Sequence, residues 1–463
     1  MGPETILIVL VLLCGFYVAW NIGANDVANA MGTSVGSGAL TLRNAVILAA
    51  IFEFAGAFIV GSNVSKTVRK GIFDPTQLNA AFPENATLIL ACGMIAALLA
   101  AGTWLLIATA MSWPVSTTHS IVGAVVGFGV VALGVDGVAW DKVGFIASGW
   151  LVSPVISGVI AYVVFRVILR SVFHQPDPVA AARRVAPRLV LLLMFVMTGM
   201  TCYKGLKPLW KRLDKDPTDP SFALFVVLIA IVLGLIGFFI TKYSLRNFKK
   251  QTDGADGEST VTAGMAGDDA ASTAASAAEL QQVEKVFCVL QIFTACLVAF
   301  AHGSNDVANA IGPLSAAYQA IDQGVIAAKS TTPIWALLLG GIGIVIGLAA
   351  WGWRVIKTVG EKITELTPSR GFCAEFAASI TILLASVLPF GLPISTTHTL
   401  VGAVLGVGLG RGIGALNLRT MRDVVAGWII TIPAGAGLSI LFYFILKFVF
   451  VDSGLFAPLS VGA

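Results

Sequence analysis

The sequence predicts an all-α, polytopic membrane protein, and its composition and hydropathy carry that prediction. Of its 463 residues, 57% are hydrophobic and 12% are charged, whereas soluble domains carry about 25% charged residues. The mean hydropathy is +0.89. Apolar runs of about 20 residues, enough to cross a bilayer, recur along the whole chain. The net charge of +4 is spread over the loops between these runs, so no basic patch for nucleic acid is expected.

Twelve apolar segments can be counted along the chain. The first, from Ile6 to Trp20, is expected to remain as a span, because Glu4 and no basic residue precedes it. The segments on either side of each STTH sequence (116–119 and 395–398) are either full spans or the arms of a re-entrant hairpin. The twelve segments are centred near residues 14, 53, 98, 127, 155, 195, 231, 297, 342, 382, 405 and 436.

Two unusual blocks of sequence each occur twice at a nearly constant spacing, which indicates a duplicated half. Residues 21–32 (NIGANDVANAMG) match residues 301–312 (AHGSNDVANAIG) at eight of twelve positions. Residues 113–129 match residues 392–408 at eleven of seventeen positions, in the same order. The first block lies in segment one and its copy in segment eight, an odd number of crossings apart. The second half is therefore expected to be inverted relative to the first, as in many secondary transporters.

The chain divides on this basis into four regions. A first inverted repeat is expected at 1–170 and a second at 286–463, with two intervening transmembrane segments at 171–250. Residues 251–285 lack aromatics and are rich in Gly, Ala and Ser over 251–282, as in a flexible linker.

The distribution of basic residues predicts the orientation. Loops after odd-numbered segments carry 18 Lys and Arg, against ten after even-numbered segments. Basic residues concentrate on the cytoplasmic side of membrane proteins. The linker is therefore expected in the cytoplasm and both termini outside, in a plasma or inner cell membrane.

The repeated NDVAN sequence puts polar groups into an apolar segment, where they are costly to keep. Asn25 and Asn29 share a helix face, with Asp26 beside them. Flanking glycines such as Gly23 are expected to break the helix and free backbone carbonyls. Such an oxygen-rich set suits a hard cation such as Na⁺; hydrogen bonding between neighbouring helices is the alternative. The predicted sodium ligands are Asn25, Asp26, Asn29, Asn305, Asp306 and Asn309.

The repeated P-[VI]-S-T-T-H sequence predicts the start of a broken helix. Pro114 or Pro393 ends the preceding helix, and the Ser-Thr-Thr run is suited to cap the next one. Helix N-termini favour anions, so two of them facing each other could surround a tetrahedral oxyanion; ordinary capping is the alternative. Neither motif holds Arg or Lys, so co-bound cations would have to balance the anion. The predicted anion-binding residues are Ser116, Thr117, Thr118, Ser395, Thr396 and Thr397.

Five further ionisable residues lie in or beside apolar runs. Glu53 and Glu375 are candidates for cation binding or gating, with a structural hydrogen bond as the alternative. His119 and His398 follow the Thr pairs and either carry protons or pack with one hydrogen bond. His302 has isoleucine at the matching position of the first half, and a local role is expected for it.

The paired GANDVANA/GSNDVANA and PVSTTH/PISTTH blocks resemble those of the inorganic phosphate transporter (PiT) family. The run at 23–41 looks like the sodium-coupled branch. The resemblance covers both halves and implies symport of phosphate with sodium ions by alternating access, commonly in a homodimer and without a further cofactor. It assigns cation and substrate contacts to the two Asn-Asp-Asn sets and phosphate contacts to the two Ser-Thr-Thr triplets. It also implies that Glu53 and Glu375 are needed for uptake.

Other functions stay open on the sequence alone. A sulfate transporter or a proton-coupled oxyanion transporter would share the same fold and motifs. A phosphate sensor would be expected to carry a signalling domain, for which residues 251–282 are too short and featureless. An enzyme with Ser116 or Ser395 as nucleophile lacks an evident oxyanion partner. The expected protein is a symporter and not an enzyme, with phosphate, sodium, the lipid bilayer and a second copy as partners.

Overall fold

The computed structural model describes residues 3–61, 72–207, 210, 216–217, 219–246, 277–324, 326, 332–361, 364–387, 394–412, 414 and 416–453. Within these residues the fold is helical, apart from a single β-bridge between Phe73 and Val138. Nine of the described helices are long and apolar enough to cross a membrane. Each of the twelve predicted segment centres lies in a helix. The predicted all-α membrane fold is confirmed.

The helices follow the same order in both halves of the chain. The first half contains α1 (Pro3–Gly36), α2 (Leu42–Val60), α4 (Gln77–Ala81), α5 (Ala86–Ala110), α6 (Thr117–Leu133), the short η2 (Val135–Gly137), α7 (Trp140–Ile168) and η3 (Leu169–Phe173). Between the halves lie α8 (Pro178–Gly205) and α10 (Pro220–Arg246). The second half contains α11 (Ala277–Asp322), α12 (Ile334–Trp351), α13 (Trp353–Glu361), α14 (Pro368–Val387), α15 (Thr396–Arg411), α16 (Leu418–Lys447) and η6 (Phe448–Asp452).

The expected linker at 251–285 lies partly outside the described residues, which resume at Ala277. From there the chain is already helical, so α11 begins earlier than the sequence indicated. Val283 and Val286 bury their side chains. Glu284 is tied to α14, because the backbone N–H and the hydroxyl of Ser369 both donate to its carboxylate at 2.8 Å. Packing of this first part of α11 therefore extends the helix into the predicted linker.

The helices α1 and α11 run unbroken through the NDVAN motifs, so the expected break at the glycines is wrong. These glycines serve close helix contacts instead. A Cβ on Gly23 would lie 1.9 Å from the carbonyl oxygen of Ile344, and one on Gly303 would lie 2.1 Å from that of Glu53. Small residues allow such approach between membrane helices. The NDVAN motifs are therefore expected to offer an ion chiefly their side-chain oxygens, because the helix itself uses the backbone carbonyls.

The chain does break at the STTH motifs, as predicted. The hydroxyl of Ser116 caps α6 by accepting the N–H of His119 at 3.3 Å, and Ser395 caps α15 in the same way at 3.1 Å. The two capped helices have 17 and 16 residues, fewer than the about 20 that a span needs. These lengths are at or just below the lower limit for a span, whereas α5 before α6 has 25 residues and is long enough to cross. The choice between full spans and re-entrant arms therefore stays a prediction.

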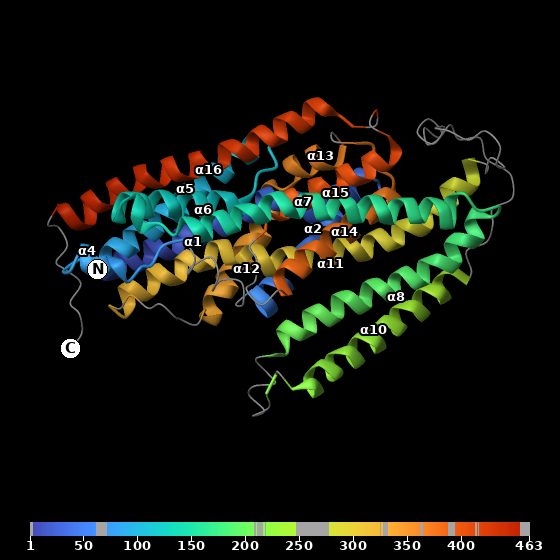
Figure 1. The fold of residues 1–463 in the computed structure, drawn as a ribbon, viewed down its shortest axis with the longest axis horizontal. Helices are drawn as coiled ribbons and strands as arrows, with labels where there is room; N and C mark the ends of the chain where they lie inside the picture. Colours follow the sequence, from blue (N-terminus) through green and yellow to red (C-terminus); the bar gives the residue numbers. More distant parts are fainter. Residues whose placement is uncertain are drawn as a thin grey trace.

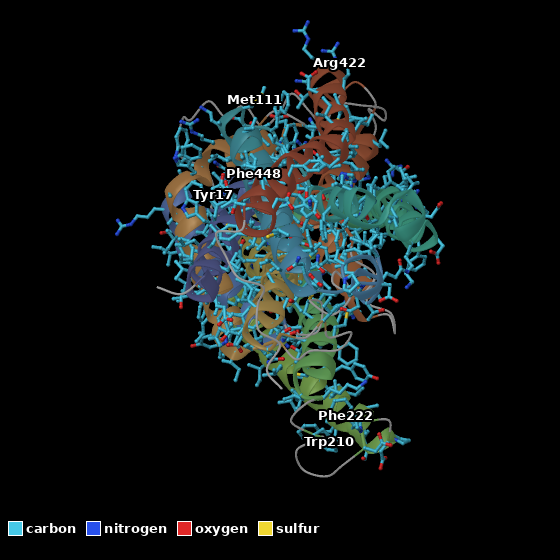
Figure 2. The ribbon with its side chains drawn as sticks, turned by 90° about the vertical axis from the view of Figure 1, so that its left-hand side faces the viewer. Tyr17, Met111, Trp210, Phe222, Arg422 and Phe448 are labelled. Atoms are coloured by element: carbon cyan, nitrogen blue, oxygen red, sulfur yellow. The ribbon has the colours of Figure 1, made fainter. Side chains whose placement is uncertain are left out.

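Helices of the two halves interlock. The helix α1 packs on α12, and α11 packs on α2; the half-helices α6 and α15 pack on α16 and α7 of the opposite half. The start of α1 and the end of α16 lie at the same end of the molecule (Figure 1). The α8–α10 hairpin stands at one side of the core, and Trp210 packs against Phe222 near its tip, with ring centroids 5.2 Å apart (Figures 1 and 2).

Candidate functional site

The two NDVAN motifs and the two Ser-Thr-Thr caps meet at one buried place. The hydroxyl of Thr117 donates to Asp26 Oδ2 at 2.5 Å, and that of Thr396 donates to Asp306 Oδ2 at 2.8 Å. Both aspartates are 1% exposed. Each carboxylate is thus held by the first threonine of the half-helix from its own half.

The second threonine of each half-helix reaches the opposite half. Asn29 Nδ2 donates to Thr397 Oγ1 at 2.8 Å, and Asn309 Nδ2 donates to Thr118 Oγ1 at 3.4 Å. Thr397 Oγ1 also donates to the carbonyl oxygen of Val115 at 3.1 Å. The start of each half-helix therefore contacts residues of the opposite half of the chain, and the two starts lie close together, as the paired motifs predicted.

The remaining asparagines of the motifs differ from each other. Asn25 holds the connection between α5 and α6: its Nδ2 donates to Thr109 Oγ1 at 2.9 Å, and its Oδ1 accepts the N–H of Val115 at 3.2 Å. Asn305 Nδ2 instead donates to Asp306 Oδ1 at 3.1 Å. In this conformation the Asn25 amide forms hydrogen bonds with the end of α5 and the segment before α6, and not with the aspartates.

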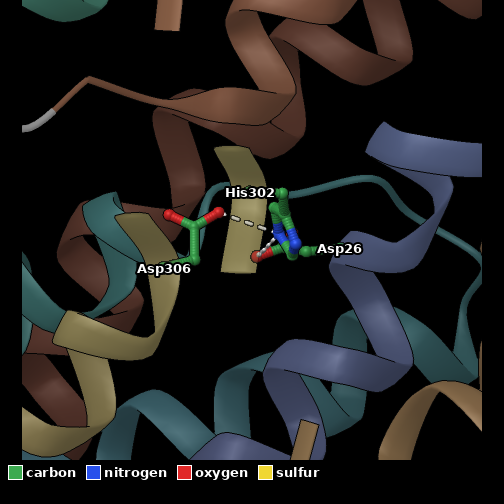
Figure 3. A group of neighbouring side chains, drawn as sticks. All are labelled: Asp26, His302 and Asp306. Atoms are coloured by element: carbon green, nitrogen blue, oxygen red, sulfur yellow. Dashed lines mark ion pairs between the residues drawn. The ribbon is translucent and has the colours of Figure 1, made fainter. Parts of the chain in front are cut away.

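His302 links the two halves, so the local role expected for it is wrong. Its Nε2 lies 2.8 Å from Asp306 Oδ2 and 3.8 Å from Asp26 Oδ2 (Figure 3). Its Nδ1 lies 3.3 Å from Glu53 Oε1. The imidazole is fully buried. Glu53 thereby joins the same cluster through the histidine. A histidine that departs from an otherwise close repeat, deep in an apolar helix, was the signal available in the sequence.

Glu375 lies in a separate polar cluster that joins α1, α11 and α14. Its Oε1 accepts from Thr33 Oγ1 at 2.5 Å, Ser34 Oγ at 2.6 Å and Gln291 Nε2 at 3.3 Å, and its Oε2 accepts from Thr294 Oγ1. All of these side chains are buried. Glu53 and Glu375 therefore have different surroundings, in keeping with their unmatched repeat positions.

His119 and His398 pack against each other and against two tryptophans. Their ring centroids are 4.3 Å apart, with the rings edge to face. His119 lies 3.8 Å from the ring of Trp150, and His398 lies 3.6 Å from that of Trp428. His398 Nδ1 is also 3.2 Å from the carbonyl oxygen of Trp150. These contacts are those of packing residues beside the caps, and proton transfer stays a prediction.

Comparison with known proteins gives the context of this arrangement. The sequence model of the phosphate transporter family matches residues 22–439. The chain is 48% identical to a candidate phosphate permease of Chlamydia pneumoniae, over 96% of this chain and 99% of the relative. It is 45% identical to inorganic phosphate transporter 2-1, chloroplastic, of Arabidopsis thaliana, over 94% of this chain and 71% of that protein.

A solved structure gives the same result for the fold. The structure described as the sodium-dependent phosphate transporter is 39% identical, with a TM-score of 0.80, and the match covers 96% of this chain and 99% of the other. The duplicated motifs, the helical membrane fold and these relatives agree with one another. The chain belongs to the phosphate transporter family.

Proposed function

We propose that this protein is a secondary symporter that imports inorganic phosphate together with sodium ions by alternating access. The observation that carries the proposal is the convergence of two half-helix N-termini and two carboxylates at one buried place. Helix N-termini with hydroxyl donors favour an oxyanion, and carboxylates favour cations. The likeness to a sodium-dependent phosphate transporter supports the same pairing of ions.

The threonine contacts give a physical reason for coupling. A hydroxyl has a single proton to donate, and the protons of Thr117 and Thr396 go to Asp26 and Asp306. A sodium ion bound to each carboxylate would offset its negative charge and weaken its hold on the hydroxyl proton. The hydroxyls could then turn to donate to phosphate, so that cation binding prepares the anion site.

Alternating access requires buried contacts between helices to be exchanged during the cycle. Glu375 fits such a gating role, because it accepts hydrogen bonds from side chains of α1 and α11. We propose that these bonds stabilise the present conformation. We further propose the inverted relation of the halves, a homodimer, and a plasma or inner membrane location with the termini outside and residues 251–276 in the cytoplasm.

Uptake of labelled phosphate into proteoliposomes tests the function. An inward sodium gradient is expected to drive accumulation, and choline in its place is expected to abolish it. Competition by excess sulfate would favour the alternative of a sulfate transporter. Equal uptake in choline would refute sodium coupling, and uptake that follows a pH gradient instead would favour proton coupling. Counterflow of labelled phosphate separates a carrier from a sensor, which would give none.

A further inference from the structure

We propose that Asp26, His302 and Asp306 form a binding site for a divalent transition-metal ion of the zinc and cobalt class. The three residues belong to α1 and α11 and meet where the two halves touch (Figure 3). This inference extends the proposed function, because the metal would occupy the two aspartates that we assign to sodium. The binding test given below requires neither sodium nor transport.

The spacing of the ligand atoms suits a small divalent ion. One imidazole nitrogen and two carboxylate oxygens lie within 4.8 Å of one another. Zinc binds such atoms at about 2.0–2.2 Å in a tetrahedron, which separates neighbouring ligands by about 3.3 Å. His302 Nε2 lies 2.8 Å from the Asp306 oxygen and 3.8 Å from the Asp26 oxygen. These two separations lie on either side of the required one, and all three ligand atoms lie within 4.8 Å of one another, so side-chain rotations can bring them to the required spacing.

The residues behind the histidine complete an arrangement typical of metal centres. A metal-bound histidine usually donates its other ring N–H to a carboxylate, which fixes the ring and its tautomer. His302 Nδ1 lies 3.3 Å from Glu53 Oε1. Glu53 is fully buried, and among the described residues neither of its oxygens accepts a hydrogen bond. A metal bound at Nε2 would place the ring proton on Nδ1, where it can donate to this carboxylate.

The aspartates are oriented in the same manner. The hydroxyls of Thr117 and Thr396 donate to the two carboxylate oxygens nearest His302, Oδ2 of Asp26 and Oδ2 of Asp306. A carboxylate oxygen has two lone pairs, so it can accept a hydroxyl and still bind a metal. Two carboxylates also neutralise a divalent cation at a buried place, where both aspartates are 1% exposed.

The chemistry of the donor set separates this ion from sodium. Hard cations select oxygen ligands, whereas imidazole suits zinc, cobalt, nickel and copper. The histidine is absent from the matching position of the first half, where Ile22 stands. The repeated Asn-Asp-Asn sets thus provide oxygens in both halves, and His302 adds one nitrogen to them. A water or an oxyanion oxygen can supply the fourth ligand.

Cobalt titration of the purified full-length protein, in detergent without sodium or phosphate, tests the site. Wild type is expected to bind one Co²⁺ with the visible absorption of a tetrahedral nitrogen- and oxygen-ligated ion, and Zn²⁺ is expected to displace it. His302→Gln is expected to lose this spectrum. His174→Gln, which removes an exposed histidine, is the control and is expected to keep it.

A second variant separates metal binding from folding. Glu53→Gln keeps the size of the side chain and leaves all three ligands in place. The cobalt spectrum is expected to persist with affinity lowered about 10–100-fold, the usual effect of changing a residue behind a metal-bound histidine. An unchanged spectrum in His302→Gln, or unchanged affinity in Glu53→Gln, would overturn the proposal.

Transport measurements keep the two proposals distinguishable. A protein that takes up phosphate with sodium but binds no Co²⁺ contradicts the metal site alone. One that binds Co²⁺ through His302 but shows no sodium-driven uptake supports the metal site and contradicts the symporter. Where both hold, micromolar Zn²⁺ is expected to inhibit sodium-driven uptake, because both ions need the same carboxylates.

Discussion

At the scale of residues, the polar side chains of the site are engaged with one another across the two halves. Asn29 donates to Thr397, and Asn309 donates to Thr118, so each half contributes the donor of one bond and the acceptor of the other. A buried polar group without a partner costs about 1–3 kcal/mol. The set is therefore expected to be sensitive to the loss of any single member.

Asp306→Asn is expected to lower sodium-driven phosphate uptake at least about tenfold. The amide keeps the shape but removes the charge, and a contact to a charged group contributes about 1.5–3 kcal/mol, where 1.4 kcal/mol is a factor of ten. Initial rates in proteoliposomes measure the effect. Asp423→Asn is the control, because Asp423 is 55% exposed and pairs with Arg422 on the surface. Equal uptake by both variants would argue against a sodium ligand at Asp306.

Thr397→Val is expected to raise the KM for phosphate about tenfold with less effect on the amount of folded protein. The substitution keeps the shape of the side chain but removes the hydroxyl that accepts from Asn29 and donates to Val115. The buried amide of Asn29 then loses its 2.8 Å partner. Thr397→Ser restores a hydroxyl and is expected to restore the KM. A valine variant with wild-type KM would contradict a role for this hydroxyl in phosphate binding.

At the scale of elements, glycines set how closely the helices approach. A Cβ on Gly406 of α15 would lie 2.0 Å from the carbonyl oxygen of Gly158 on α7, and one on Gly127 of α6 would lie 2.6 Å from that of Ala436 on α16. Each half-helix is thus pressed against a long helix of the opposite half. The positions of the N-termini of α6 and α15 depend on these contacts.

Gly406→Ala is expected to destabilise the protein by about 1–3 kcal/mol, the usual effect of overpacking a tight contact. The apparent Tm in detergent should fall accordingly. Gly144→Ala is the matched control: Gly144 also lies in a helix but is exposed and has no atom within 4 Å of an added Cβ. That variant is expected to be neutral or slightly stabilising, because alanine favours helix over glycine. A Gly406→Ala protein as stable as Gly144→Ala would show that α15 and α7 can separate freely.

At the scale of the whole molecule, the start of α1 and the end of α16 lie at one end of the fold (Figure 1). This arrangement agrees with the prediction that both termini lie on the same side of the membrane. The prediction that this side is the outer one depends on the distribution of Lys and Arg in the loops. Accessibility measurements can decide it.

In a variant without the six native cysteines, a cysteine at Asp136 is expected to react with an impermeant maleimide on intact cells. A cysteine at Gln175 is expected to react only after permeabilisation. Both residues are exposed; Asp136 lies in a loop after an even-numbered segment and Gln175 in one after an odd-numbered segment. The reverse labelling would place the termini in the cytoplasm.

Much of the site could be predicted from the sequence because its polar residues belong to short, contiguous motifs. The serine caps of α6 and α15 follow from Ser-Thr-Thr after a proline-ended helix, and the aspartates stood out as charges in apolar segments. The unbroken course of α1 through Gly23 could not be predicted in this way. Glycine reads equally as a helix break or as a close contact, and only the position of Ile344 O, 1.9 Å from a Cβ at Gly23, decides between them.

The sequence by itself determined the class of the protein, the positions of the apolar segments and the paired polar motifs, because hydropathy and capping are properties of neighbouring residues. The tertiary structure decided which helices of the two halves interlock and that His302 stands between Asp26, Asp306 and Glu53. Contacts of this kind join residues that are distant in the chain. They depend on how close two backbones can pack, and no local pattern of sequence reports that distance.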